Sequence, residues 1–254
     1  MPVHDLIGGL VRDRVQGYVW LGCEASDDEP DAVAAEALAR MREGVDAFKL
    51  TAPSFPPTGY GSRLQLVYDQ MAATRAAVGP ERDIALDCHG RTDPRQAGEL
   101  LRVLTPLRPL FVEEPVLPEL TDELEALCAH TNIPIAAGER AFDRHESWRL
   151  LEAGVQVLQP DVAQSGGISE LMRICTIASL TGARVAPHCA IGPLALAASI
   201  QIGLAAPEAL IQEDPAMPDE RSVFDGYLTD SSLLHMDHGY FVPNGAPGLG
   251  VEVI

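Results

Sequence analysis

The sequence predicts a (β/α)7β barrel, a TIM-like fold in which short parallel strands alternate with helices around one core. The chain has 254 residues, 46% of them hydrophobic, which is enough to bury one large core. Short apolar runs alternate with helical patterns along most of its length. Three of these runs end on Asp87, Glu113 and Glu139, at equal intervals of 26 residues. That interval matches one strand-and-helix unit of such a barrel.

Eight strands are expected, each a short apolar run that ends on a polar residue. They are predicted at residues 15–21, 47–50, 83–89, 110–114, 133–139, 155–161, 183–189 and 209–214. Seven helical patterns lie between them, and several end at Gly or before Pro. The clearest are predicted at residues 32–44, 63–79, 94–104, 119–130, 168–182 and 193–205. We expect one domain over residues 1–254, with residues 215–254 as an irregular tail in place of a final helix.

Composition limits the functional classes. A net charge of −19, from 37 acidic and 18 basic residues, disfavours a nucleic-acid partner because phosphate binding needs a basic surface. No apolar run is long enough to cross a membrane, and the first thirty residues lack the apolar core of a signal peptide. The five cysteines are scattered without a CxxC pair, which favours reduced thiols. These features predict a cytoplasmic enzyme domain without a membrane partner.

The three equally spaced carboxylates predict a metal site. Equal intervals would place Asp87, Glu113 and Glu139 at the same height on neighbouring parallel strands. The same spacing selects Glu113 as the ligand and leaves its neighbour Glu114 at the rim. Three oxygen ligands without a cysteine suit Mg²⁺, with Mn²⁺ as the other candidate.

Other polar residues also lie at the predicted strand ends, where barrel enzymes carry their active sites. Alternation along the strand places Asp87 and His89 on the inward face and turns Cys88 outward, where it would serve packing. Every strand but the first contributes to the set, which is Lys49, Asp87, His89, Glu113, Glu139, Asp161, His188 and Glu213.

These residues lie in motifs that resemble the enolase superfamily along nearly the whole chain. The motifs are, in order, LDCHGR, LFVEEPVLPE, IPIAAGERAF, LQPDVAQSGGISE, VAPHCAIGPLALAASIQ and IQE. The most specific are the Asp-x-His at Asp87 and His89 and the series Asp161, His188 and Glu213. In these the chain is similar to the sugar-acid dehydratases of the mandelate racemase subgroup, in particular those acting on galactonate.

The resemblance implies a lyase that dehydrates a galactonate-like sugar acid to a 2-keto-3-deoxy sugar acid through an enediolate, with bound Mg²⁺. It implies that Asp87, Glu113 and Glu139 hold the metal. His188 would be the general base, oriented by Asp161, and His89 the acid that protonates the departing 3-hydroxyl. Glu213 would hydrogen-bond the substrate carboxylate, and Lys49 would contact the carboxylate or the enediolate. The implied substrate-binding residues are thus Lys49, His89, His188 and Glu213.

Two departures from the family pattern keep alternatives open. Racemases of the subgroup carry Lys-x-Lys where this chain has Lys49, Leu50 and Thr51, so an acid-sugar epimerase or racemase is the weaker alternative. Family members also begin with an α+β capping domain, whereas residues 1–14 here resemble the join into the barrel. A catalytically weak or silent metal-binding barrel, either a truncated enzyme or an assembly subunit, is the second alternative. Without the capping domain, the rim of the barrel would expose apolar surface, which would favour a homo-oligomer.

Overall fold

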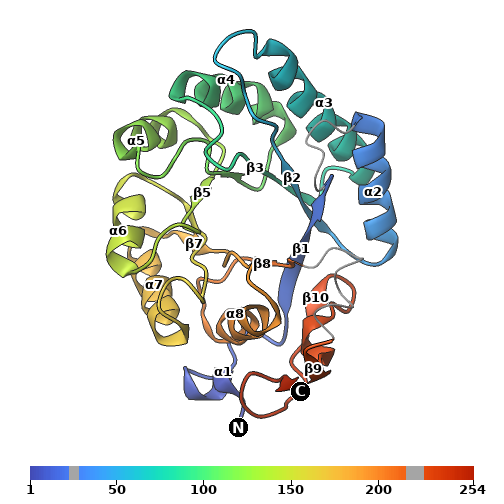
Figure 1. Ribbon diagram of the computed structural model, residues 1–254, viewed down its shortest axis with the longest axis vertical. Coiled ribbons are helices and arrows are strands. Elements are labelled where there is room, and N and C mark those ends of the chain that lie inside the picture. The colour runs from blue at the N-terminus through green and yellow to red at the C-terminus, as the bar shows by residue number, and fades with distance from the viewer. Residues whose placement is uncertain (23–28, 216–225) are drawn as a thin grey trace. The chain divides into compact units, whose positions relative to one another are not determined.

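The computed structural model describes residues 1–22, 29–215 and 226–254, and within them the chain divides into two compact units. Both units are built of short strands and of helices that flank them (Figure 1). Unit 1 comprises Met1–Val19, Gly138–Leu151 and Leu158–Ile254, and unit 2 comprises Trp20–Ala137 and Glu152–Val157. The single-domain organisation stays a prediction.

Unit 2 contains a parallel sheet whose strands follow one another in the chain. Its strands are β2 (Ala47–Thr51), β3 (Asp83–Asp87), β4 (Val112–Glu113) and β5 (Ile135–Ala137). In the register of this sheet, Asp87 pairs with Thr51 on one side and with Glu113 on the other, and Glu113 pairs with Ala136. The carboxyl ends of β3 and β4 therefore lie side by side, as expected for consecutive parallel strands.

The helices of unit 2 cover one face of this sheet (Figure 1). They are α2 (Pro30–Arg42), α3 (Gly61–Val78), α4 (Pro94–Leu104) and α5 (Thr121–His130), with the short 3-10 helix η1 (Thr105–Leu107) after α4. The start of α4 is fixed by a capping box, because Asp93 accepts from the Gln96 backbone N at 2.8 Å and the Gln96 side chain accepts from the Asp93 backbone N at 3.0 Å. The end of α3 is set by Gly79, whose φ of +86° stops the helix.

In unit 1 the strand β1 (Val15–Leu21), whose last residues belong to unit 2, has partners from late in the chain. It pairs in parallel with β8 (Gln212–Glu213), with Tyr18 opposite Glu213. On its other edge it pairs antiparallel with β10 (Tyr240–Phe241), with Val15 opposite Phe241. The neighbouring strands β6 (Val157–Leu158) and β7 (Arg184–Val185) complete the main strands of this unit.

The helices of unit 1 are α1 (Val3–Leu6), α6 (Arg144–Glu152), α7 (Ile168–Thr181) and α8 (Pro193–Ala205). Helix α8 is apolar and largely buried, and it approaches β1 closely at Gly203, where an added Cβ would meet Val15 at 3.1 Å. Arg12 satisfies the carbonyl groups at the end of α8, because its guanidinium donates to the carbonyl oxygens of Gly203, Ala206 and Pro207.

All eight predicted strands are present, although most are shorter than predicted. The seventh helix is α6, while α1 has no counterpart among the predicted elements. The tail has more regular structure than predicted, since β9 (Leu228–Asp230) pairs antiparallel with β11 (Glu252–Val253), and η2 (Ser232–Leu234) lies between them. In the described part of the tail no α-helix follows β8; residues 216–225 lie outside the described residues.

Two further sequence predictions meet the structure here. Among the residues that the structure describes, no helix is both long and apolar enough to span a bilayer. Cys88 is fully buried, which confirms its predicted packing role, and burial raises the pKa of its thiol well above the ordinary value. Cys128, Cys175 and Cys189 are likewise buried thiols, whereas Cys23 lies outside the described residues.

Candidate active site

In unit 2 a buried ionic cluster occupies the ends of three neighbouring strands. The Lys49 ammonium on β2 lies 2.7 Å from Glu113 Oε2 at the end of β4 and 3.3 Å from Asp87 Oδ2 at the end of β3. All three side chains are at most 1% exposed, and buried charges of this kind need close partners of opposite sign. Two of the predicted metal ligands thus share one ammonium, so Lys49, expected only as a substrate contact, also offsets part of their negative charge.

His89 lies beside this cluster in a left-handed backbone conformation, with φ of +50°. Its backbone N donates to Asp87 Oδ1 at 2.9 Å, and its ring Nδ1 lies 3.1 Å from the same oxygen. The predicted proximity of Asp87 and His89 is therefore present, although it depends on a turn after β3 and not on strand alternation. Such a conformation is uncommon outside glycine and often marks a functional site.

Trp20 contacts both Lys49 and His89. The Lys49 ammonium lies 4.1 Å from the centroid of the Trp20 ring, and the His89 ring stacks on the indole at a centroid distance of 6.0 Å and an interplanar angle of 29°. A search for polar residues at strand ends passes over this residue. Alternation along β1 is the signal that finds it, because Tyr18 and Trp20 share one face of the strand.

In unit 1 a histidine and an aspartate from successive strand ends form a close pair. His188 Nδ1 lies 2.9 Å from Asp161 Oδ2, and Asp161 Oδ1 accepts a hydrogen bond from the Ala163 backbone N at 2.8 Å. His188 Nε2 lies 3.6 Å from Glu139 Oε2. Asp161 is fully buried, while the His188 side chain is 13% exposed. The aspartate therefore fixes the ring and turns Nε2 to the side of Glu139.

Glu213 stabilises the backbone next to His188. Its carboxylate is buried at the end of β8 and accepts a hydrogen bond from the Cys189 backbone N at 2.7 Å. Because Cys189 directly follows His188, this bond fixes the backbone next to the imidazole. The structure thus gives Glu213 a contact with the chain itself, in addition to the substrate contact that the sequence implies.

Glu139 reaches its place through a turn, and the prediction of equal strand height is wrong for this residue. Glu113 is in register with Ala136, so Glu139 lies three positions further along the chain, beyond the end of β5. The backbone turns at Gly138, whose φ is +141° and where an added Cβ would lie 2.8 Å from the Gln159 backbone N. Only glycine fits this close approach, which sequence spacing alone does not reveal.

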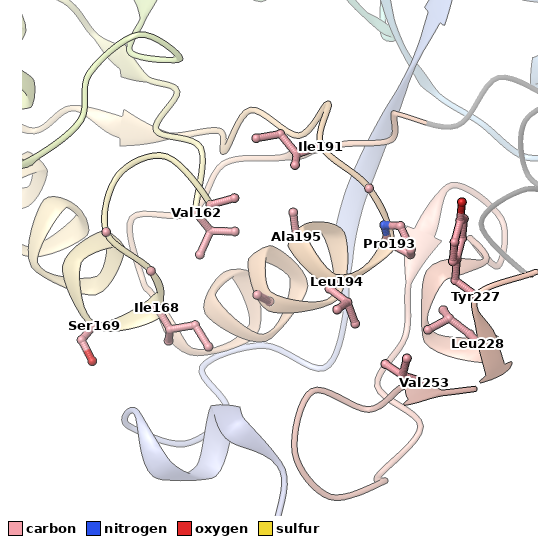
Figure 2. Close-up of a pocket in the computed structure, with 15 residues that line it drawn as sticks. Val162, Ile168, Ser169, Ile191, Pro193, Leu194, Ala195, Tyr227, Leu228 and Val253 are labelled. Carbon is pink, nitrogen blue, oxygen red and sulfur yellow. The ribbon is translucent and has the colours of Figure 1, made fainter.

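Beside the histidine pair, unit 1 has an apolar pocket of about 860 Å³ (Figure 2). Its walls come from the loop that follows Asp161, from the start of α8 and from the tail residues Tyr227, Leu228 and Val253. Figure 2 shows the side chains of Val162, Ile191 and Leu194 around the same space. None of the described lining residues is an acidic or basic one such as Asp, Glu, His, Lys or Arg, which distinguishes this pocket from the strand ends.

Parallel strands with helices, carboxylates at the strand ends and an Asp–His pair on successive strands fit a barrel of the enolase type. The chain belongs to the Enolase C-terminal domain-like family, whose sequence profile matches residues 32–254. The predicted fold class, the TIM-like barrel of the enolase superfamily, is confirmed.

Among individual relatives, the chain is similar to several D-galactonate dehydratases. It is 39% identical to the enzyme of Ralstonia nicotianae over 100% of this chain and 66% of that protein. Identity to the enzyme of Cronobacter sakazakii is 38%, over 99% of this chain and again 66% of the relative. The chain therefore spans just under two thirds of the length of these relatives.

Solved structures give the same family. A mandelate racemase/muconate lactonizing enzyme from Jannaschia sp. CCS1 superposes with a TM-score of 0.90 at 33% identity, covering 99% of this chain and 67% of that one. A member of the enolase superfamily from Salmonella Typhimurium has a TM-score of 0.88 at 29% identity, covering 100% of this chain and 69% of the other.

Proposed function

We propose that the chain carries the site of a Mg²⁺-dependent lyase that dehydrates a D-galactonate-like sugar acid to the 2-keto-3-deoxy acid, with Mn²⁺ as the other candidate metal. The observation that carries the proposal is the His188–Asp161 pair at 2.9 Å, with Nε2 of the partly exposed imidazole facing Glu139. This is the arrangement that a general base needs beside an electrophilic centre. The names of the D-galactonate dehydratases, at 38–39% identity, support the substrate class.

The donor set fits the metal. Asp87, Glu113 and Glu139 each offer a carboxylate oxygen, and no thiol is among them, which suits a hard divalent cation. We propose that these three residues hold it together. When bound, the cation supplies positive charge that stabilises the negative charge growing on the substrate carboxylate as the neighbouring carbon loses its proton.

His188 is proposed to take that proton at Nε2. Its Nδ1 faces Asp161, so the neutral ring carries its hydrogen at Nδ1 and its lone pair at Nε2. The buried aspartate also stabilises the imidazolium that forms, because an opposite charge at 2.9 Å favours the protonated ring. The Ala163 backbone N, which binds the other Asp161 oxygen, keeps the carboxylate in this orientation.

His89 is proposed to protonate the departing 3-hydroxyl from Nε2, since its Nδ1 faces Asp87. Lys49 would bind the substrate carboxylate or the enediolate with its ammonium, and the Glu213 carboxylate would bind the substrate carboxyl group. We expect these steps in a cytoplasmic homo-oligomer. Neither the base role of His188 nor the acid role of His89 requires a second base on β2, where Thr51 stands two residues after Lys49. That absence disfavours an epimerase or racemase.

One observation favours the alternative of a catalytically silent barrel. Lys49 already pairs with both Asp87 and Glu113, so the chain itself offsets part of the negative charge of this buried cluster. A barrel could therefore keep these residues for stability alone. Turnover of a sugar acid would decide against that reading.

The test is turnover with a panel of sugar acids. We expect the purified chain with Mg²⁺ to convert D-galactonate to its 2-keto-3-deoxy acid, detected by NMR, and to lose this activity with EDTA. Because the chain spans 66% of the relatives' length, the assay includes a fusion to the N-terminal third of a D-galactonate dehydratase. Mg²⁺ binding without turnover of any sugar acid in either form would establish the silent barrel instead.

A further inference from the structure

Trp20, on the first strand, contacts two members of the proposed site. It stands on the same face of β1 as Tyr18, near the carboxyl end of the strand, and it is partly exposed while Val19 and Leu21 on the other face are buried. The predicted strand-end residues come from every strand but this one. Trp20 therefore fills the position at which β1 meets the site.

The two contacts of Trp20 are a cation–π contact with Lys49 and ring stacking with His89. The face of an aromatic ring is negative, so it attracts a cation placed above it, and indole does so more strongly than the other aromatic rings. The Lys49 ammonium lies 4.1 Å from the ring centroid, and the His89 ring is stacked on the indole at 6.0 Å. An aliphatic side chain could fill the same space without this attraction.

Lys49 and His89 also contact carboxylates of the cluster. Lys49 is tied to Asp87 and Glu113 through a flexible stem, and His89 is tied to Asp87 through one ring nitrogen. Contact with a rigid ring further restricts the rotation of the Lys49 and His89 side chains. The indole is thus placed to fix the direction of the Lys49 ammonium and the His89 ring at once.

We infer that Trp20 is a positioning residue of the proposed dehydratase site: its indole holds the Lys49 ammonium by a cation–π contact and orients the His89 ring by stacking. The inference rests on the proposed function. It assigns Trp20 no contact with the reacting atoms. Its effect passes through His89 to the loss of the hydroxyl and through Lys49 to substrate binding.

The experiment compares two reactions of the same protein. Exchange of the α-proton with deuterated solvent requires His188, whereas dehydration also requires His89. In Trp20→Leu we expect the ratio of exchange to dehydration to rise about tenfold, a part of the ~10²–10⁴-fold that a general acid supplies. KM should also rise as Lys49 loses its support. Trp20→Phe, which keeps a ring face, should recover most of both effects.

The matched control is Trp148→Phe, the other of the two tryptophans, which lies on α6 and outside the site. It should leave both reactions and their ratio unchanged. If Trp20→Leu lowers exchange and dehydration equally, Trp20 is only a structural residue and the inference is wrong, while the proposed function stands. If the unmodified chain and its fusion neither exchange nor dehydrate, the proposed function fails and this inference fails with it.

A spectroscopic measurement gives a second readout that does not depend on turnover. In Trp148→Phe all tryptophan emission comes from Trp20. A divalent cation bound by Asp87 and Glu113 changes the charge around the ammonium that lies on the indole, so titration with MgCl₂ should shift this emission with the same midpoint as the rise in melting temperature. Unchanged emission alongside a rising melting temperature would contradict the placement of Trp20.

Discussion

The buried ionic cluster of unit 2 (Lys49, Asp87 and Glu113) and the His188–Asp161 pair of unit 1 use similar residue types for different purposes. In unit 2, Lys49, Asp87 and Glu113 stand on regular strands, are at most 1% exposed and form ion pairs through the one ammonium. In unit 1, His188 stands beyond the short strand β7, is 13% exposed and depends on Asp161 for its orientation. The first cluster holds charge in place, and the second has a group able to gain and lose a proton.

This difference separates stability from catalysis. Removing one partner from a compensated buried set leaves an uncompensated charge, which strongly destabilises a fold. Replacing a partly exposed imidazole leaves a smaller defect, because water can reach the site and Asp161 keeps its bond from the Ala163 backbone N. Substitutions in unit 2 should therefore change stability first, and substitutions in unit 1 should change turnover first.

The largest expected effect is on the two histidines. His188→Asn should abolish exchange of the α-proton with deuterated solvent, whereas His89→Asn should retain exchange and lose dehydration by ~10²–10⁴-fold. Asparagine suits position 89 because it tolerates the left-handed conformation found there. The measurement is ¹H NMR of D-galactonate incubated with each variant and Mg²⁺ in D₂O. Exchange that persists in His188→Asn and disappears in His89→Asn would reverse the two roles.

Lys49→Met should show the largest effect on stability. Methionine keeps much of the stem but leaves Asp87 and Glu113 without their ammonium, and breaking a buried ion pair in this way costs about 3–5 kcal/mol. Urea unfolding should show a lower midpoint with an unchanged slope, and Mg²⁺ should recover part of the loss. His188→Asn is the matched comparison and should cost much less. Equal losses in the two variants would remove the contrast between the clusters.

Magnesium should raise the melting temperature of the unmodified chain. At a concentration of about 100 times Kd the gain is about 2.7 kcal/mol, which corresponds to roughly 5–10 °C for a chain of this size. Asp87→Asn, Glu113→Gln and Glu139→Gln should each erase the increment, because each removes a proposed ligand. A full increment in Glu139→Gln would show that the cation binds to the unit 2 cluster without the contribution of unit 1.

The smallest expected effect lies in unit 1 but outside the site. Hydrogen bonds from Arg144, and then from Arg173, lower the pKa of Glu170 to about 2. The ionised form is thus favoured by folding, so its contribution is complete above the ordinary carboxyl pKa of 4.5 and is lost as the pH falls towards 2. Glu170→Gln should lower the melting temperature at pH 7 by at most about 2–4 °C, since exposed ion pairs contribute little. The difference in melting temperature between the variant and the unmodified chain should shrink towards pH 2, and turnover at pH 7 should be the same in both.

The sequence predicts the scaffold well because the relevant signals are local. Apolar runs that end on polar residues mark the strands, and the interval of 26 residues between Asp87 and Glu113 corresponds to direct register on β3 and β4. The Asp161–His188 contact also follows, since consecutive strand ends lie side by side. The roles assigned to the site residues remain predictions, to be decided by the experiments above.

The features that were not predicted depend on contacts between distant segments or on backbone geometry. The turn at Gly138 exists because the chain passes within contact of Gln159, and no pattern near Gly138 shows this. The left-handed conformation of His89 likewise leaves no mark in its neighbours. Trp20 was missed for a different reason: an indole acts here through its ring face, and a search for titratable groups excludes it.

The pairing of β1 has a consequence for the order in which this protein forms during synthesis. Unit 2 joins strands that follow one another, so β2 and β3 can pair as soon as both have left the ribosome. Strand β1 emerges earlier, but Tyr18 cannot pair with Glu213, nor Val15 with Phe241, until those residues have been translated. Until β8 and β10 have been translated, β1 lacks those partners, and unpaired strand edges invite aggregation. The growing chain therefore carries an incompletely paired β1 until β8 and β10 cover it.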